Sequence, residues 1–376
     1  MLKISIKPEW SLETGDKNAS ALPRLLQLLP AVEKEGNLRR AACKLGISYR
    51  HAWGLIRNGG KAFGAPLLKM SRGRGATLSA VGEKLLWADK RIAARLAPML
   101  DSLASELKLE IERALHDAQP ILRIHASHGF AIELLRDFMA ARHSPVDLKY
   151  RGSMEALASL AGSDCEIAGF HAPLGVLQSE VLRYYGKWLR PGRQSLISLC
   201  TRRQGIMVPA GNAKGIVSLA DLARPGVRFV NRQFGSGTRV LLDMLLRREN
   251  VDSAGICGYE SGEFTHSGVA AYIASGLADA GFGVETAARR FQLEFIPVIT
   301  ERYCLICEDD FLTSPLVSQI LEILTSSQFR AAAGNLAGID VTYAGTVMSL
   351  AEAFPQLAAT PREGASQRDS RLRKVS

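Results

Sequence analysis

The sequence lacks the segments and motifs of several common protein classes. In its 376 residues no uninterrupted apolar stretch reaches the roughly 20 residues that span a bilayer, and no secretory signal pattern opens the chain. No G-x-S-x-G elbow, Walker loop, H-E-x-x-H pair or metal-ligand cluster occurs. We therefore expect a cytoplasmic protein that is not an enzyme, contacts no membrane and holds neither a cofactor nor a metal.

Cysteine is scarce, and its six copies are scattered along the chain. Only Cys304 and Cys307 form a C-x-x-C pair, which lies in the strand-like run RYCLIC with no second Cys or His pair nearby. A structural zinc ion needs four ligands, so we interpret this pair as packing residues. A cytosolic setting would keep all six thiols reduced.

Acidic residues are absent from one stretch, Asn37 to Arg74, which contains nine basic residues. The basic excess belongs to the N-terminal part of the chain: residues 1–118 contain 20 Lys and Arg against 12 Asp and Glu, and the remainder contains 27 against 25. A concentrated positive charge of this kind is typical of a surface that binds the phosphates of DNA.

Three helices are predicted within this basic region. The first is Leu25 to Glu35; the second, LRRAACKL, is capped by Asn37 and ends at Gly46; the third, SYRHAWGLI, is capped by Ser48. Two short helices around a glycine turn indicate a helix-turn-helix. The apolar residues expected where its two helices touch are Ala41, Ala42, Leu45, Ile47, Ala52 and Leu55. We also expect Trp53 to lie in the core.

A wing should follow the third helix. PLLKM and ATLS are predicted strands, and the basic turn RGRG joins them. The alternative is an ordinary surface hairpin, but its place in a basic domain favours contact with phosphates or the minor groove. The expected DNA-binding residues are Arg39, Arg40, Ser48, Tyr49, Arg50, His51, Arg57, Arg72 and Arg74.

The run EGNLRRAACKLGISYRHAWGLI, followed by PLL and LSAVGEKLL, resembles the winged helix of molybdenum-dependent (ModE-like) regulators, which are close to the LysR type. ISYRHAW is its most specific part. The resemblance implies a homodimeric transcription factor that binds a palindromic operator in double-stranded DNA, with a tetramer left open.

A connecting helix is predicted from Ser79 to about Asp117. Its apolar residues recur mainly every three or four positions, so they can pair with a second copy of the helix or pack on their own domain. We favour dimerisation. Pro98 should kink or divide the helix, because proline removes a backbone donor. The stripe comprises Leu85, Ile92, Leu96, Met99, Leu103, Leu107, Ile111 and Leu115.

Beyond Gln119-Pro120 the pattern changes to alternating strands and helices, which indicates α/β architecture with mainly parallel strands. Helices are expected at 130–142 and 238–249. Strands are expected at ILRIHA, DLKYRGS, EIAGFH, SLISLCT, GIMVP, VRFVN, AGFGV, FIPVI and RYCLIC.

This half resembles the periplasmic-binding-protein-like domains of cytoplasmic regulators. The motifs that carry the likeness are GFH at 169–171, RRQGIMVPAGN at 202–212, LADLARPGVRFVNRQFGSGTR, and THSGVAAYIASGLADAGFGVE at 265–285. The resemblance implies two α/β lobes around a ligand cleft.

The expected fold is therefore an α+β multidomain chain. Residues 1–78 form the winged helix-turn-helix domain, 79–118 the linker helix and 119–350 the ligand-binding domain, and 351–376 form a tail with a disordered end. Lobe I takes about 119–200 and 300–350, and lobe II takes about 201–299.

The effector is expected at strand ends and helix N-termini. Ser236 and Thr238 can instead simply cap a helix, His128 and His266 can be core or surface residues, and Arg202 and Arg203 can be solvated. The candidate ligand-binding residues are Ser127, His128, Ser153, His171, Arg203, Arg232, Gly235, Ser236, Gly237, Thr238, Arg239, Thr265 and His266.

Hydroxyl and amide donors suit a tetrahedral oxyanion, and NRQFGSGT is similar to the Arg-and-SGT loop of tungstate-binding transport receptors. The expected function is thus a regulator whose effector is molybdate or tungstate. A small organic ligand and, as a different class, a solute-binding receptor without a DNA role remain as alternatives.

Overall fold

The computed structural model describes residues 4–10, 22–71, 75–115, 121–142 and 144–357. The chain divides into two compact units. The first comprises Leu109–Gln204 and Val298–Ser376, and the second comprises Leu2–Lys108 and Gly205–Pro297. Among the described residues no helix combines the length and the apolarity that a membrane span requires.

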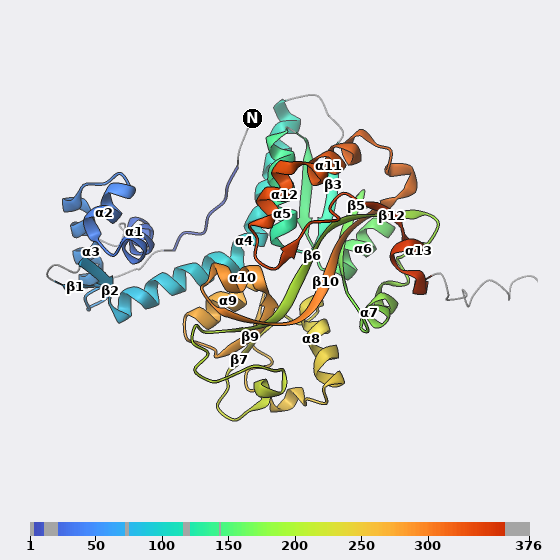
Figure 1. The fold of residues 1–376 in the computed structure, drawn as a ribbon. Coiled ribbons are helices and arrows are strands. Elements are labelled where there is room, and N and C mark those ends of the chain that lie inside the picture. Colours follow the sequence, from blue (N-terminus) through green and yellow to red (C-terminus); the bar gives the residue numbers. More distant parts are fainter. Residues whose placement is uncertain (1–3, 11–21, 72–74, 116–120, 143, 358–376) are drawn as a thin grey trace, which may run out of the picture. The chain divides into compact units, whose positions relative to one another are not determined.

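The N-terminal part of the second unit is the predicted winged helix (Figure 1). Its first helix begins three residues before the predicted start, and the wing is an antiparallel pair with Ser71 opposite Gly75. The tip residues Arg72 and Arg74 lie outside the described residues. The elements are α1 (Leu22–Glu35), α2 (Leu38–Lys44), α3 (Tyr49–Ala62), β1 (Leu68–Ser71) and β2 (Gly75–Leu78).

The helix-turn-helix forms where its capping residues predict it. The Asn37 side chain accepts hydrogen bonds from the backbone N–H groups of Arg39 (2.8 Å) and Arg40 (3.2 Å), and Ser48 Oγ accepts one from His51 (3.1 Å). These contacts satisfy amides that have no partner within their helix. Gly46 takes φ +66° in the turn between the helices, a conformation that favours glycine.

The predicted helix contacts are mostly confirmed. Ala41, Ala42, Ala52 and Leu55 are buried, and Ile47 packs against the same core. The prediction for Leu45 is wrong, because its side chain is 38% exposed. Helix α2 ends at Lys44, so Leu45 no longer continues the buried face of that helix.

The linker is one helix, α4 (Ala80–Leu115), with Pro98 inside it. The helix is therefore not divided at Pro98, and the alternative of a kink there stays a prediction. Near its start the helix closes the winged-helix core, where Leu85 and Leu86 are buried among the apolar side chains of α1 and α3.

The first unit is built on the strand order β4-β3-β5-β10-β6, with β11 and β12 paired to β6. Strand β3 is parallel to β4 and β5, whereas β10 is antiparallel to β5, so the sheet is mixed. Its elements are β3 (Leu122–Ala126), α5 (Phe130–Ala141), β4 (Val146–Tyr150), α6 (Ser153–Ala161), β5 (Ile167–Pro173), α7 (Gln178–Tyr185), α11 (Pro315–Thr325), α12 (Ser327–Gly334), β11 (Ile339–Asp340), β12 (Val347–Ser349) and α13 (Leu350–Ala353).

Lobe II, in the second unit, has a smaller parallel arrangement in which β7 lies between β9 and β8. Its elements are β7 (Phe229–Arg232), α8 (Gly237–Arg248), β8 (Gly262–Glu263), α9 (His266–Ala274), β9 (Ala280–Val284) and α10 (Glu285–Arg290).

Two strands are longer than the sequence indicates. SLISLCT and GIMVP belong to one strand, β6 (Gln194–Val208), and FIPVI and RYCLIC belong to one strand, β10 (Glu294–Glu308). Each strand passes from one unit to the other. The start of the predicted tail is also ordered, since Phe354 is fully buried against Phe170.

Each lobe contains a topological switch point. In lobe I the chain goes from β3 to β4 on one side of β3 and then to β5 on the other; in lobe II it goes from β7 to β8 and then to β9. In open α/β sheets, ligands bind outside the carboxyl ends of the strands at such points. The fold therefore directs attention to the segments that follow β3 and β7.

Gly82 tests the close packing of the linker on the winged helix. A Cβ at this position would lie 2.3 Å from the carbonyl oxygen of Leu67, whereas a Cβ at Gly54 in α3 would meet nothing within 4 Å. We expect Gly82→Ala to lower the free energy of unfolding by about 2 kcal/mol through overpacking. Gly54→Ala should raise it by about 0.5–1 kcal/mol through helix propensity. Urea unfolding measures both, and equal effects would contradict the close approach.

Candidate functional sites

Helix α3 presents an aromatic and basic face to solvent. Its buried residues are Ala52, Leu55, Ile56 and Gly59. Trp53 lies about 100° around the helix from Ala52 and is 41% exposed, so its predicted place in the core is wrong. The exposed residues of this face are Tyr49, Arg50, Trp53 and Arg57.

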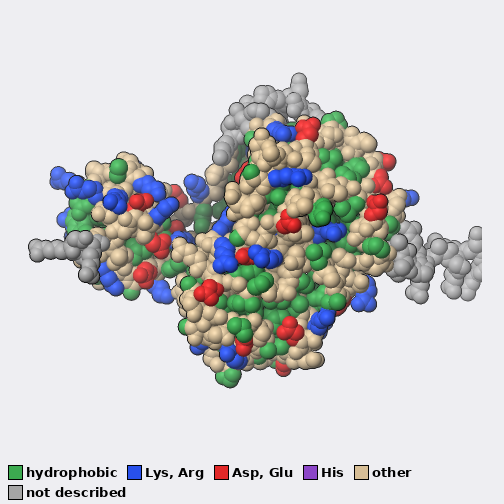
Figure 2. All heavy atoms as spheres, in the orientation of Figure 1, with side chains coloured by type: hydrophobic (Ala, Val, Ile, Leu, Met, Phe, Trp, Pro, Cys, Tyr) green, Lys and Arg blue, Asp and Glu red, His purple; other side chains and the backbone are tan. Residues whose placement is uncertain are grey.

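Further predicted DNA-binding residues lie close to this face. The guanidinium of Arg39 sits 5.5 Å from the centre of the Tyr49 ring, and Arg24 Nη1 lies 3.4 Å from His51 Nε2. Arg40 is exposed on α2, while Ser48 is occupied in capping α3. Figure 2 shows Lys and Arg side chains on the visible surface of α1 to α3. The arrangement provides positive charge together with flat apolar rings.

In lobe I the structure brings together three predicted residues at the switch point. Ser127 follows β3, Ser153 begins α6, and their Oγ atoms are 3.3 Å apart. The backbone N–H of His171 in β5 donates to Ser153 Oγ at 3.2 Å. The hydroxyls thus lie at the start of α6, where backbone amides favour an anion.

Three residues that were not predicted complete this group. Arg202 and Glu301 form a buried ion pair, and Glu301 Oε1 lies 3.5 Å from His171 Nδ1. Tyr303 faces His171 across the β5–β10 pair. Its hydroxyl donates a hydrogen bond to the carbonyl of Ser127 at 2.6 Å. Burial raises the pKa of Tyr303, so the hydroxyl stays protonated and remains a donor. We call Ser127, Ser153, His171, Arg202, Glu301 and Tyr303 the lobe I cluster.

Gly169 of the GFH motif makes room for this cluster. A Cβ at Gly169 would lie 3.1 Å from Cε2 and 3.2 Å from the hydroxyl of Tyr303, and 2.7 Å from the Cβ of Ala126. A larger residue would therefore push the tyrosine away from the carbonyl of Ser127.

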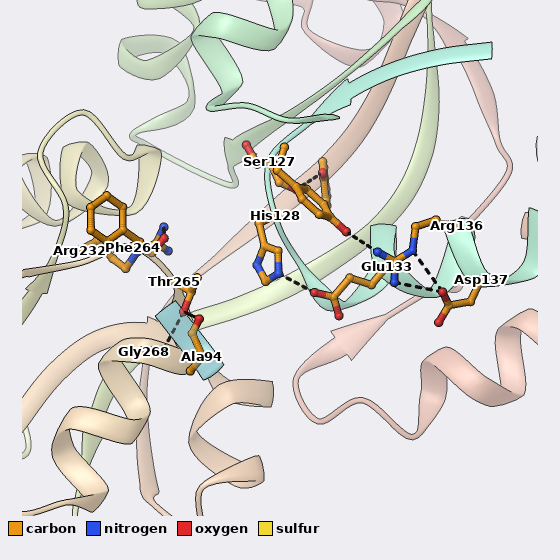
Figure 3. Close-up of polar contacts among 12 residues, drawn as sticks. Ala94, Ser127, His128, Glu133, Arg136, Asp137, Arg232, Phe264, Thr265 and Gly268 are labelled. Atoms are coloured by element: carbon orange, nitrogen blue, oxygen red, sulfur yellow. Dashed lines mark hydrogen bonds and ion pairs between the residues drawn. The ribbon is translucent and has the colours of Figure 1, made fainter. Parts of the chain in front are cut away.

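The prediction of Arg203 is not supported by its position. Its side chain is exposed, whereas Arg202 is 7% exposed and belongs to the lobe I cluster. Successive residues of a strand point to opposite faces, so only one of the two can point inward. His128 is also set apart: its Nε2 lies 2.6 Å from Glu133 Oε1, and its ring packs on Tyr150 (Figure 3).

In lobe II the segment NRQFGSGTR, residues 231–239, follows β7 and starts α8. Gly235 takes φ +80°, and Ser236 caps α8 by accepting a hydrogen bond from the N–H of Arg239 at 3.2 Å. Gly237 and the buried Thr238 form the first turn. Phe234, which lies in the chain between β7 and this first turn, is 88% exposed. In this structure Ser236 thus makes the contact of a helix cap, which was the alternative to ligand binding.

The two predicted arginines of this segment bind groups of their own lobe. Arg232 donates through Nε to the carbonyl of Glu263 (3.1 Å) and through Nη2 to that of Phe264 (2.8 Å). Arg239 binds the Glu260 carboxylate at 3.0 Å. Arg232 therefore joins the end of β7 to the segment that follows β8.

Thr265 and His266 begin α9. Thr265 is 1% exposed; its Oγ1 accepts a hydrogen bond from the N–H of Gly268 at 2.7 Å and donates one to the carbonyl of Ala94 in α4 at 2.9 Å (Figure 3). His266 is 4% exposed. The hydroxyl hydrogen of Thr265 is thereby used within the protein.

The C-x-x-C pair is buried in β10. Cys304 and Cys307 are free cysteines, and burial raises the pKa of each to about 12. They remain protonated thiols that pack in the sheet, and the described residues include no group of side chains suited to a metal ion.

Comparison with known proteins gives two family matches, one to the winged helix and one to the domain that follows the linker helix. Residues 23–83 match the bacterial regulatory helix-turn-helix protein, lysR family, and residues 136–325 match the PBP superfamily domain. The chain is 31% identical over 251 residues to YvgK of Bacillus subtilis (strain 168), which covers 65% of this chain and 79% of that protein.

Two further matches are shorter or more distant. Molybdenum-pterin-binding protein MopB of Rhodobacter capsulatus is 31% identical over 111 residues, which are 28% of this chain and 40% of that protein. Full-length LysG of Corynebacterium glutamicum with bound effector Arg is 18% identical, covers 80% of this chain and 95% of that chain, and has a TM-score of 0.39.

The sheet with its switch points and the helix-turn-helix with its wing thus agree with the two family matches: the chain belongs to the PBP superfamily, and it carries this domain behind a helix-turn-helix domain of the LysR family.

Proposed function

We propose that this protein is a DNA-binding transcriptional regulator that responds to a small anionic effector. The proposal is based on the exposed face of α3. This face presents Tyr49, Arg50, Trp53 and Arg57 together on a helix that a major groove accommodates. No acidic residue occurs between Asn37 and Arg74 to oppose a phosphate backbone.

Two copies of the chain would read two half-sites. Met99, Leu103 and Leu107 recur every four residues on α4 and are 63%, 45% and 40% exposed. An apolar stripe of this kind on a long helix suits pairing with a second copy. A dimer would place two α3 helices on half-sites roughly 34 Å apart in a palindromic operator, with the wing arginines Arg72 and Arg74 on the flanking phosphates.

The switch point of either lobe offers a place for the effector. Lobe I offers the hydroxyls of Ser127 and Ser153, and lobe II offers Ser236, Thr238 and the first amides of α8. These neutral donors suit a tetrahedral oxyanion, because the nearby arginines already have carboxylate or carbonyl partners. The match to MopB, a protein named for binding molybdenum-pterin, supports molybdate or tungstate.

An organic effector is the second candidate. Phe234 and Phe264 follow the adjacent strands β7 and β8 and are 88% and 57% exposed. Two exposed rings beside the start of α8 suit a ligand that carries an apolar group as well as an acid group.

DNA affinity should depend on Arg50 and Arg57 through their binding of phosphates. We expect Arg50→Ala or Arg57→Ala to weaken binding to all duplexes and to reduce the slope of log affinity against log salt by about one, because each variant neutralises one phosphate fewer. Gel shifts over a salt series on duplexes enriched from a random pool measure this. Arg193→Ala, an exposed arginine in the first unit, is the control, and an equal effect there would contradict the assignment.

Trp53 should contribute to sequence discrimination. Trp53→Ala is expected to lower the ratio of specific to non-specific affinity by about tenfold, the cost of roughly one mismatched base pair, with an unchanged salt slope. Trp53→Phe, which keeps an apolar ring, should retain most of the ratio. Competition gel shifts measure it, and an unchanged ratio for Trp53→Ala would contradict this role.

Ser236 should matter for the effector beyond its role as a cap. Ser236 and Ser314 each cap a helix through a hydrogen bond of 3.2 Å, so either change to Ala should cost about 1 kcal/mol of stability. Only Ser236→Ala should also abolish the rise in melting temperature on adding molybdate, tungstate or a small organic acid. Thermal-shift titration tests this, and loss of the ligand response in Ser314→Ala alone would refute the proposed site.

A further inference from the structure

The linker helix contains a carbonyl that cannot be satisfied within the helix. In an α-helix the carbonyl of Ala94 would accept a hydrogen bond from the N–H of residue 98, but residue 98 is proline and has no N–H. Helix α4 nevertheless continues through this position to Leu115. The hydroxyl of Thr265 donates to this same carbonyl at 2.9 Å.

The Thr265 side chain is buried, and its hydroxyl takes part in two hydrogen bonds. It is 1% exposed, and its Oγ1 also accepts the N–H of Gly268 at 2.7 Å as the N-cap of α9 (Figure 3). A hydroxyl has a single hydrogen to donate, and the carbonyl of Ala94 takes it.

Further polar contacts of α4 with lobe II lie at both ends of α9. At its start, Arg95 Nε lies 3.0 Å from the buried carboxylate of Glu263. At its end, Arg91 Nη1 donates to Ser275 Oγ and Lys84 Nζ to the Ser275 carbonyl, both at 3.2 Å. The positions 84, 91 and 95 fall on one face of α4, so α9 is attached along it.

The attachment also connects to the segment 231–239. Arg232 binds the carbonyls of Glu263 and Phe264, and the side chains of Glu263 and Thr265 bind α4. Arg232 and Ala94 are therefore connected through the backbone at Phe264–Thr265, with one hydrogen bond on each side.

We propose that Thr265 is a positioning residue that supplies the hydrogen bond missing at Pro98 and thereby fixes the linker helix to the segment 231–239. Because residue 98 is proline, α4 needs a donor from lobe II to satisfy the carbonyl of Ala94. Arg232 connects this attachment to the segment that leads into α8. The use of this connection as a route from effector to DNA rests on the proposed function, whereas the attachment itself does not.

Hydrogen exchange of the α4 amides in the full-length chain, measured without DNA or added ligand, tests the attachment. One hydrogen bond corresponds to a change of roughly three- to tenfold in an opening equilibrium. We expect Thr265→Val to speed exchange of the α4 amides around Ala94 by this factor and Thr265→Ser, which keeps the hydroxyl, to leave it within about twofold.

The Pro98→Ala variant provides the decisive background, because alanine at position 98 restores the backbone N–H that can donate to the carbonyl of Ala94. In Pro98→Ala protein, Thr265→Val should change the same exchange rates less than about twofold. Thr265→Asp, which still caps α9 but donates no hydrogen when ionised, replaces the valine variant if that protein does not fold. Equal effects in both backgrounds, or no effect of Thr265 in either, would overturn the proposal. A failure of DNA binding would leave this result unchanged, so the two hypotheses fail separately.

Discussion

The structure depends on a backbone constraint in α4. A helix of 36 residues passes through Pro98, which withholds one amide hydrogen, so the carbonyl of Ala94 must find a donor outside the helix. Thr265 provides it, and the N-terminal turns of α4 close the core of the winged helix through Leu85 and Leu86. One helix thereby contacts both the winged helix and lobe II.

Both lobes place polar donors at the same kind of position by the same topology. The order β4-β3-β5 and the order β9-β7-β8 each reverse direction at the first strand of the lobe, so the following segment lies at a carboxyl edge. Most charge near these edges is already paired: Arg202 with Glu301, Arg239 with Glu260. Buried charges are costly unless paired, so these arginines are satisfied within the protein and the neighbouring hydroxyls and amides are neutral donors.

Local signals in the sequence predicted much of this arrangement. Asn37, Gly46 and Ser48 fix the helix-turn-helix through caps and a left-handed turn, and each acts within three residues of its own position. Ser127 and Ser153 are predicted because each follows an expected strand, and His171 because it ends the expected strand EIAGFH, although it lies within β5. The segment 231–239 was found from its glycines and serine.

Interactions between distant residues could not be predicted in this way. Tyr303 reaches Ser127 across 176 positions, and Thr265 reaches Ala94 across 171, with no spacing that connects them. Trp53 was placed in the core because aromatic residues usually are, although the helical period already separates it from Ala52. Arg202 and Arg203 are adjacent, and only the strand's orientation decides which is buried.

The proposed function requires one chain to link an anion in its PBP-like domain to DNA on its winged helix. Such linkage is reciprocal, so the most direct measurement is calorimetric titration of the anion that stabilises the protein most, with and without an enriched DNA duplex. The duplex should change anion affinity by about fivefold or more, and the anion should change duplex affinity by the same factor. Tight binding of both partners with no change in either affinity would contradict it.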